Sequence, residues 1–181
     1  MSEPRTGRTL FTGLADGPPV SEYATRSAEP ADVPGIQRVA RAGWHAAYDD
    51  SMGPDTVDDC IDDWYDAETL VGAIEDDDVD YLVATVDERL VGYASVGPTG
   101  DDRSETVAGL YSIYVHPDRW GAGIGTALFE RCADRLRERG FERLCLRVVA
   151  DNEVGISFYR RHDFERTDEE TVELQGQPLV E

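Results

Sequence analysis

The sequence contains no lysine. Its 17 basic residues are all arginine, and they stand against 38 aspartates and glutamates, which gives a formal net charge of −21 over 181 residues. A chain without lysine cannot supply the Gly-Lys-Ser/Thr of a Walker A loop. Nonspecific binding to nucleic acid needs clustered cationic side chains that release counterions from phosphates. We therefore expect neither a P-loop nucleotide site nor a nucleic-acid partner.

Cysteines and long apolar runs are also scarce. Only Cys60, Cys132 and Cys145 occur, with no Cys-x-x-Cys or other paired metal-ligand spacing, so we expect buried free thiols in a reducing cytosol and no metal site. No run of 18 apolar residues occurs, and residues 1–15 lack the apolar core of a secretion signal. The sequence thus predicts a cytoplasmic location and no membrane partner.

The large excess of acidic residues is typical of a protein that stays soluble in concentrated salt. At about 1 M ionic strength the Debye length is only about 3 Å, so repulsion among the carboxylates would be screened. A halophilic cytoplasm is our interpretation, and an acidic mesophilic protein is the alternative. A cationic or amine-bearing acceptor is compatible with this field, although net charge alone does not select one.

A chain of 181 residues has the length of one domain. We interpret residues 1–19, rich in Gly, Thr and Pro, as a flexible tail and residues 20–181 as a single folded domain. Apolar periodicity and turn residues predict a mixed α/β sheet with an order of strand, helices, three strands, helix, strand, helix and two strands. The expected strands are 20–26, 81–86, 90–96, 106–115, 143–149, 165–174 and 177–180. The expected helices are 33–50, 55–64, 66–74, 124–140 and a short one after Asn152.

Glycines at positions 121, 123 and 125 separate the strand that ends near Val115 from the next helix. Glycine lets a backbone come close to a ligand, and the helix that follows presents unpaired N–H groups and a positive dipole end. This arrangement predicts an anion cradle suited to a phosphate or pyrophosphate. The dinucleotide fingerprint Gly-x-Gly-x-x-Gly fails, because Thr126 or Leu128 occupies the place of its last glycine.

Two segments resemble the GNAT superfamily of N-acetyltransferases. The first resembles its acetyl-CoA motif, with the core Gln/Arg-x-x-Gly-x-Gly/Ala, and reads Tyr114-Val115-His116-Pro117-Asp118-Arg119-Trp120-Gly121-Ala122-Gly123-Ile124-Gly125-Thr126-Ala127-Leu128. The second is similar to the family's strand, asparagine turn and "FYRRxGF" helix, and comprises Leu146-Arg147-Val148, Asp151-Asn152 and Phe158-Tyr159-Arg160-Arg161-His162-Asp163-Phe164. The resemblance covers about residues 20–180 and is weakest before Tyr81. Trp120 replaces the family's Gln or Arg, and Asp163 replaces its Gly.

The resemblance implies a GNAT fold, in which a mixed, mostly antiparallel central sheet is splayed between its fourth and fifth strands and flanked by helices. It implies acetyl-CoA as co-substrate, with the pantetheine arm in the gap between those strands. The implied binding residues are Ile113, Tyr114, Val115, Trp120, Gly121, Ala122, Gly123, Ile124, Gly125, Thr126, Asn152, Tyr159 and Arg161. With Trp120 in the motif, pyrophosphate binding should depend on the backbone amides of residues 121–126.

The activity that the resemblance implies is acetyl transfer to a primary amine, either a small metabolite or a protein N-terminus, by direct attack in a ternary complex. Tyr159 is the expected general acid for the leaving thiolate, with a packing aromatic as the alternative. Tyr111 and Glu105 are further candidates for a proton relay, and the acceptor candidates are Trp44, His45 and Tyr48. A non-catalytic, acyl-CoA-binding GNAT-like sensor or subunit is the competing hypothesis. The acceptor, the general base and the oligomeric state stay open, and a homodimer is one option.

Overall fold

The computed structural model describes residues 23–99, 105–169, 171–174 and 177–180. The predicted tail at residues 1–19 lies outside these ranges. Within them, none of the helices combines the length and apolar composition that crossing a bilayer requires.

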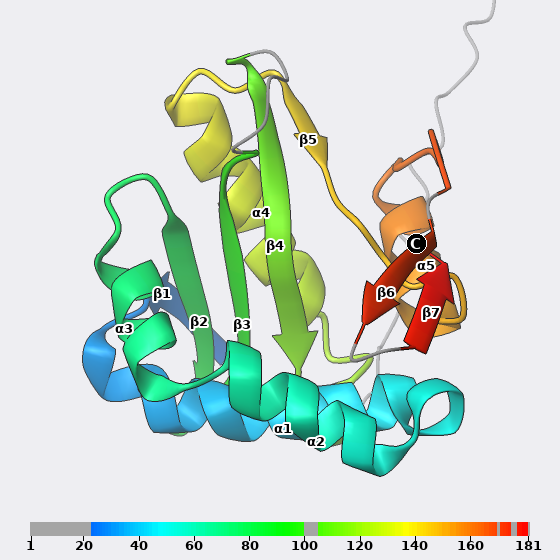
Figure 1. Ribbon diagram of the computed structural model, residues 1–181. Helices are drawn as coiled ribbons and strands as arrows, with labels where there is room; N and C mark the ends of the chain where they lie inside the picture. The colour runs from blue at the N-terminus through cyan, green and yellow to red at the C-terminus, as the bar shows by residue number, and fades with distance from the viewer. Residues whose placement is uncertain (1–22, 100–104, 170, 175–176, 181) are drawn as a thin grey trace, which may run out of the picture.

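Five strands form the central sheet, side by side in chain order. They are β1 (Tyr23–Ser27), β2 (Asp80–Val86), β3 (Arg89–Pro98), β4 (Val107–Val115) and β5 (Arg143–Cys145). Among the first four, adjacent strands are antiparallel, whereas β5 runs parallel to β4. This mixed, mostly antiparallel sheet with flanking helices confirms the predicted fold class (Figure 1).

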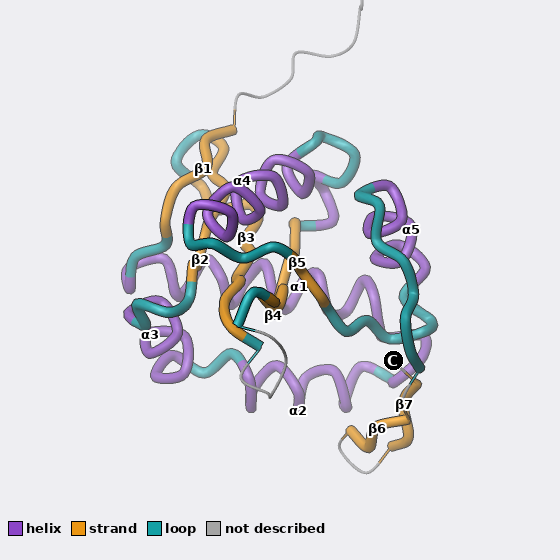
Figure 2. The backbone as a smooth tube through the Cα atoms, turned by 90° about the horizontal axis from the view of Figure 1, so that it is seen from above, coloured by secondary structure: helices purple, strands orange, loops and turns teal. Residues whose placement is uncertain are grey.

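Helices cover both faces of the sheet. One face carries α1 (Val33–Met52), α2 (Pro54–Trp64) and α3 (Ala67–Glu75), the opposite face carries α4 (Ile124–Glu138), and α5 (Glu153–Arg161) stands beyond β5 (Figures 1 and 2). Two short 3-10 turns precede α1 and α4, at Pro30–Asp32 and Pro117–Arg119. Because both faces are covered, β3 is buried almost continuously instead of alternating.

The side chains of β2 divide the core into two layers. Tyr81 and Val83 belong to the cluster under α1, whereas Leu82 and Ala84 belong to the cluster under α4. Successive side chains of a strand point to opposite faces, so this short apolar run serves both layers.

Strands β4 and β5 separate soon after they pair. The pairing joins Val107–Gly109 to Arg143–Cys145, and β4 then continues to Val115 without β5 beside it (Figure 1). This confirms the predicted splay between the fourth and fifth strands. The same separation shortens the strand predicted at 143–149: residues 146–149 have strand-forming side chains but no partner strand in the described part of the chain.

Of the two closing strands, the first begins later than predicted, whereas the second has the predicted bounds 177–180. β6 (Thr171–Leu174) starts later than the predicted residue 165, and β6 pairs with β7 (Gln177–Val180) in a separate two-stranded sheet. The central sheet ends at β5, because the chain after β5 passes into α5 rather than back along the sheet edge (Figure 1).

Candidate functional site

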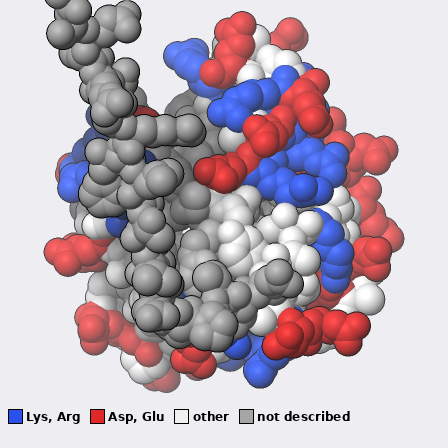
Figure 3. Space-filling model, turned by 180° about the vertical axis from the view of Figure 1, so that it is seen from behind, with Lys and Arg blue, Asp and Glu red and all other residues white. Residues whose placement is uncertain are grey.

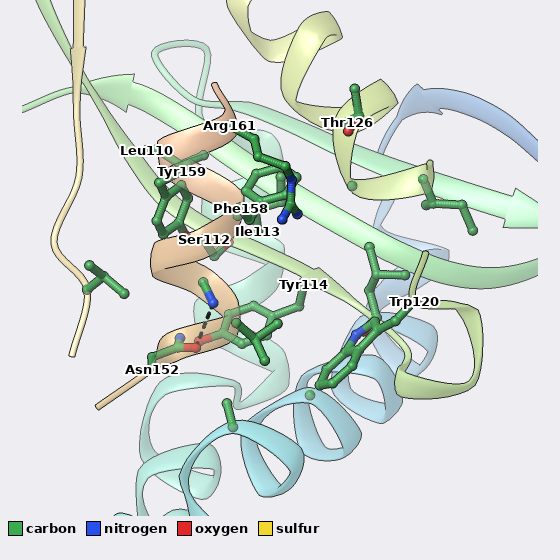
Figure 4. A pocket seen from close by; sticks show the side chains of 18 of the residues that line it. Leu110, Ser112, Ile113, Tyr114, Trp120, Thr126, Asn152, Phe158, Tyr159 and Arg161 are labelled. Atoms are coloured by element: carbon green, nitrogen blue, oxygen red, sulfur yellow. Dashed lines mark hydrogen bonds between the residues drawn. The ribbon is translucent and has the colours of Figure 1, made fainter. Parts of the chain in front are cut away.

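A cleft of about 420 Å³ opens between β4, the start of α4 and α5, and we call it the cleft (Figure 4). The structure brings the two sequence motifs together in it. The predicted residues that line it are Tyr48, Tyr111, Ile113, Tyr114, Val115, Trp120, Gly121, Gly123, Ile124, Gly125, Thr126, Asn152, Tyr159 and Arg161.

The glycine turn has a backbone that other residues adopt only with strain. Gly121 has φ 78° and Gly123 has φ 79°, and Gly123 caps α4 in the left-handed region. The first bond of the helix that follows runs from the Ala127 N–H to the Gly123 carbonyl, at 3.0 Å. The N–H groups of residues 124–126 precede that bond and lie in the first turn, where no helical carbonyl is available to them. They form the predicted anion cradle at a positive dipole end.

Gly125 meets a second requirement, which is close packing. A Cβ placed on it would lie 3.3 Å from Cε2 of Phe158, a residue of α5 that also lines the cleft. The absence of a side chain at 125 therefore lets α5 approach the start of α4. Sequence reasoning did not select Phe158, although the third glycine of the turn pointed to a close neighbour of this kind.

The charge of the cleft is opposite to that of the whole chain. Arg119, Arg147 and Arg161 line it, and none of the described residues that line it is an aspartate or glutamate. Arg161 extends from α5 toward the side that carries Thr126 and Trp120 (Figure 4). Elsewhere the charges are mixed. Figure 3, which views the molecule from behind, shows acidic side chains around much of that face with arginines between them. The cleft is thus suited to an anion with several phosphate oxygens.

Sequence reasoning did not select Arg147, which it placed inside the strand predicted at residues 143–149. The chain leaves β4 after Cys145, and Arg147 then lines the cleft. Arg119 had been noted in the sequence, and Arg161 had been selected for the phosphates.

A β-bulge interrupts the pairing of β3 and β4. Ser95 pairs with Ser112 and Val96 with Leu110, so Tyr111 is the extra residue. Past the bulge, the His116 N–H donates to the Val91 carbonyl at 2.8 Å. The backbone groups of His116 and, two residues earlier, of Tyr114 therefore face β3. The N–H and C=O groups of Ile113 and Val115 consequently face the side that β5 has left. This exposed backbone edge is what a short extended ligand needs for pairing.

Trp120 holds the glycine turn to β4. Its side chain is 45% exposed, and its indole N–H donates to the Val115 carbonyl at 2.8 Å. The predicted contact of Val115 with a pantetheine arm must therefore use its N–H or the second lone pair of its carbonyl.

Asn152 connects α5 with α1. Its side-chain oxygen accepts from the Gly155 N–H at 2.8 Å, which caps α5, and its amide nitrogen donates to the Tyr48 hydroxyl at 3.0 Å (Figure 4). These bonds fix one wall of the cleft. The direct bond from Asn152 to pantetheine stays a prediction.

Tyr159 projects from α5 toward β4, beside Leu110 and Ser112 (Figure 4). Burial of its hydroxyl, with a smaller contribution from Tyr48, raises the pKa of Tyr159 above its ordinary value. The phenol therefore keeps its proton at neutral pH. The role of Tyr159 as general acid stays a prediction.

Four predicted residues are not among those that line the cleft. Ala122 is exposed in the glycine turn, and Glu105 is exposed in the turn before β4. The ring of His45 contacts Asp49 and Asp58, at 2.7 Å and 3.3 Å. Trp44 is buried at 8% exposure and lines a second hollow on the other side of β4. The roles assigned to these residues stay predictions.

The fold and the cleft define a class of protein: a split α/β sheet with a phosphate-type cradle beside an exposed strand edge. Residues 40–164 match the model of the Acetyltransferase (GNAT) family. The chain belongs to this family, and the resemblance seen in the sequence is confirmed.

Curated relatives differ in how much of their length this chain spans. Acetyltransferase SG1711 of Sodalis glossinidius is 34% identical over 124 residues, which is 68% of this chain and 82% of that protein. Mycothiol acetyltransferase of Actinosynnema mirum is 31% identical over 167 residues, 88% of this chain but 50% of that protein. The mycothiol acetyltransferase of Saccharomonospora viridis is 31% identical over 62% of this chain, which spans 35% of it. The chain thus corresponds to half or less of these two mycothiol acetyltransferases.

Solved structures share the fold. The paiA N-acetyltransferase from Thermoplasma acidophilum, in complex with coenzyme A, superposes with a TM-score of 0.73 at 21% identity over 88% of this chain and 96% of that one. The ribosomal-protein-S18-alanine N-acetyltransferase from Escherichia coli has a TM-score of 0.65 at 19% identity, over 88% and 89% of the two chains. At these identities the likeness concerns the fold alone.

Proposed function

We propose that this protein transfers an acetyl group from acetyl-CoA to a primary amine. The observation that carries the proposal is the meeting, in one cleft, of an anion cradle, an unpaired strand edge and a buried protonated tyrosine. Membership of the acetyltransferase family supports the same reaction class.

The residues of the cleft fit acetyl-CoA along its length. The amides of Gly121 and of residues 123–126, with Arg119 and Arg161, would hold phosphate oxygens through charge-assisted hydrogen bonds. The backbone of Ile113 and Val115 would pair with the amides of pantetheine. The co-substrate supplies an acetyl group activated as a thioester, and the chain supplies orientation and proton transfer.

A direct transfer requires a neutral amine, a polarised carbonyl and a proton for the departing sulfur. A β4 N–H near the bulge, that of Ile113 or a neighbour, donates to the thioester carbonyl. Tyr159 donates its proton to the thiolate as the C–S bond breaks. Burial raises the pKa of Tyr159, and it also makes a thiolate in the same cleft more basic, so proton transfer stays balanced.

The cysteines offer no equally good covalent route. Cys145 is half-buried, and its thiol donates to the Ala108 carbonyl of the neighbouring strand at 3.4 Å. It is not among the residues that line the cleft. A thiol held between paired strands has little access to a thioester.

Initial velocities of CoA release, measured at several fixed amine concentrations, test this proposal. We expect intersecting double-reciprocal lines, and we expect Cys145→Ser to retain the activity. Parallel lines together with an inactive Cys145→Ser would show a covalent acetyl-enzyme instead. Tight binding of acetyl-CoA without CoA release for any amine would favour the sensor hypothesis.

A further inference from the structure

A second hollow, of about 470 Å³, lies on the α1 side of the sheet. Its walls come from α1, α2, α3, the segment after α3, and strands β2 to β4. Much of its lining is aromatic or aliphatic, including Trp44, Trp64, Tyr65, Leu70 and Ala73. Volume and lining are those of a site for a small organic molecule.

This second hollow and the cleft meet at one stretch of β4. Tyr111, Ser112 and Tyr114 line both. This stretch contains the bulge at Tyr111 and overlaps the exposed backbone edge at Ile113 and Val115, which faces the cleft. A molecule in the second hollow therefore contacts β4 on the α1 side of the sheet. It does so at the same residues of β4 that a ligand in the cleft would contact from the other side.

Exposed apolar side chains concentrate at these two places. The large hydrophobic residues that the described part of the chain exposes are Trp64 at 44%, Tyr111 at 50%, Trp120 at 45% and Val154 at 57%. Each of them lines the cleft or the second hollow, and Trp64 and Tyr111 line the second hollow. Apolar surface left open in a concave place marks a ligand site rather than a core.

A single carboxylate gives the second hollow its charge. Within the part of the chain that the structure describes, Asp76 is the one acidic side chain among the residues that line the cleft or the second hollow, and none of these residues is a histidine. Arg139 pairs with Asp78 and Asp80, at 3.5 Å and 3.0 Å, whereas the Asp76 carboxylate accepts a hydrogen bond from the Asp78 N–H at 2.9 Å. Burial is the main cause that raises the pKa of Tyr111, and the negative charge of Asp76 raises it further. The Asp76 carboxylate therefore lies near β4.

We propose that the second hollow is the acceptor site and that the acceptor is a small primary amine on a flat apolar body the size of an aromatic ring. This inference rests on the proposed function. The ring lies against Trp64 and the aliphatic residues of α3, Asp76 attracts the ammonium group, and the nitrogen reaches the thioester past Ser112. The faces of the aromatic rings also favour a cation.

The atoms balance in a simple sequence. The ammonium group releases a proton to water, and its nitrogen forms the C–N bond while the C–S bond breaks. Tyr159 gives its proton to the sulfur, and the proton that leaves the new amide nitrogen returns to Tyr159 through solvent. No oxidant, metal or covalent enzyme intermediate is needed.

Phenethylamine is the probe, and ethylamine, phenethyl alcohol and a peptide with N-terminal phenylalanine are the comparators. We expect kcat/KM for phenethylamine to exceed that for ethylamine by at least about tenfold, because the ring is buried in the second hollow. We expect the alcohol to inhibit weakly, since it lacks the charge. A peptide that is acetylated much better than phenethylamine would overturn the small-amine assignment.

Two variant pairs test the named contacts. Asp76→Asn should raise the KM for phenethylamine about tenfold with kcat and the KM for acetyl-CoA unchanged, because one charge-assisted contact is lost. Asp77→Asn removes a neighbouring exposed carboxylate that does not line the second hollow, and it should behave as the wild type. Trp64→Ala should raise the same KM by a similar factor, and Trp64→Phe, which keeps a ring, should restore most of it.

The inference and the proposed function fail in different ways. If CoA is released but Asp76→Asn and Asp77→Asn behave alike, or the two amines are equivalent, the acceptor assignment is wrong and the acetyltransferase stands. If no amine releases CoA, tryptophan fluorescence decides. Saturable quenching by phenethylamine that is reduced in Trp64→Phe and unchanged in Trp120→Phe supports the site, and its absence overturns it.

Discussion

The cleft and the second hollow share β4 but are built in different ways. The cleft depends on backbone: two glycines at positive φ, the first N–H groups of α4, and a strand edge without a neighbour. The second hollow depends on side chains from α1, α2, α3 and three strands. A site made of backbone requires particular residues at short spacing, whereas a site made of side chains can vary at each position. The comparison predicts that the cleft is sensitive to changes in backbone conformation and that the second hollow is sensitive to changes in side-chain chemistry.

High pH should have the largest effect, which is a loss of stability, because buried tyrosines form and support the wall of the second hollow. Burial is the main cause that raises the pKa of Tyr65, Tyr81, Tyr93 and Tyr114. Above about pH 10 the unfolded chain loses these protons and the folded chain keeps them, so the free energy of unfolding falls as pH rises. Each tyrosine should contribute about 1.4 kcal/mol per pH unit until its folded pKa is reached.

Denaturant titrations at successive pH values measure this slope. They should show little contribution from these groups between pH 7 and 9 and a steep loss above 10. Tyr93→Phe removes one titrating group and should make the loss shallower. A slope that is the same in this variant would contradict the assignment.

On the other side of β4, Gly123→Val should abolish the anion cradle. The φ of 79° at Gly123 strains a β-branched residue by about 1–3 kcal/mol, and the backbone amides would turn away from the phosphates. We expect the Kd for acetyl-CoA, measured by calorimetry, to rise at least about 100-fold, as for the loss of several charge-assisted hydrogen bonds.

Gly140→Val is the matched control, because Gly140 has φ 88° and lies after the end of α4, outside the lining of the cleft. It should show a comparable loss of stability and an unchanged Kd. If both variants lose affinity for acetyl-CoA equally, backbone strain and not the anion cradle would explain the rise in Kd.

Much of the cleft could be predicted from the sequence because its chemistry is encoded at short range. The turn from Trp120 to Thr126 and the segment around Asn152 each carry their requirement within a few residues. Arg147 could not be placed, because the divergence of β4 and β5 is a tertiary event that a local pattern does not encode. Asp76 carries no local signal either, since the packing of α3 against α1 and β2 brings it to the second hollow.

The same limits appear in the fold. The apolar pattern located the helices and the first four strands to within a few residues, because most of these elements bury an apolar face. The predicted strand at 143–149 was too long, because strand propensity at residues 146–149 does not supply a hydrogen-bonding partner. The closing strands β6 and β7 pair with each other, which a local pattern cannot distinguish from pairing with the central sheet.

Tyr159→Phe should separate chemistry from binding in the cleft. Removal of a general acid typically costs about 10²-fold or more in rate, and the ring that packs on Phe158 and Phe164 is kept. We expect kcat to fall by about that factor with the KM for acetyl-CoA unchanged. Full activity in this variant would assign Tyr159 to packing.

Trp120→Phe should have the smallest effect. It removes the bond from the indole to the Val115 carbonyl, which contributes about 1 kcal/mol at most on a partly exposed residue. The Kd for acetyl-CoA should rise no more than about fivefold. A loss as large as that of Gly123→Val would mean that the side chain, and not the backbone amides, binds the phosphates.

Calorimetric titration of the protein with acetyl-CoA, CoA, ATP and NAD tests the central claim most directly. The account predicts saturable binding of acetyl-CoA and CoA that Gly123→Val abolishes and Gly140→Val retains. Binding of ATP or NAD, with none of acetyl-CoA, would contradict it.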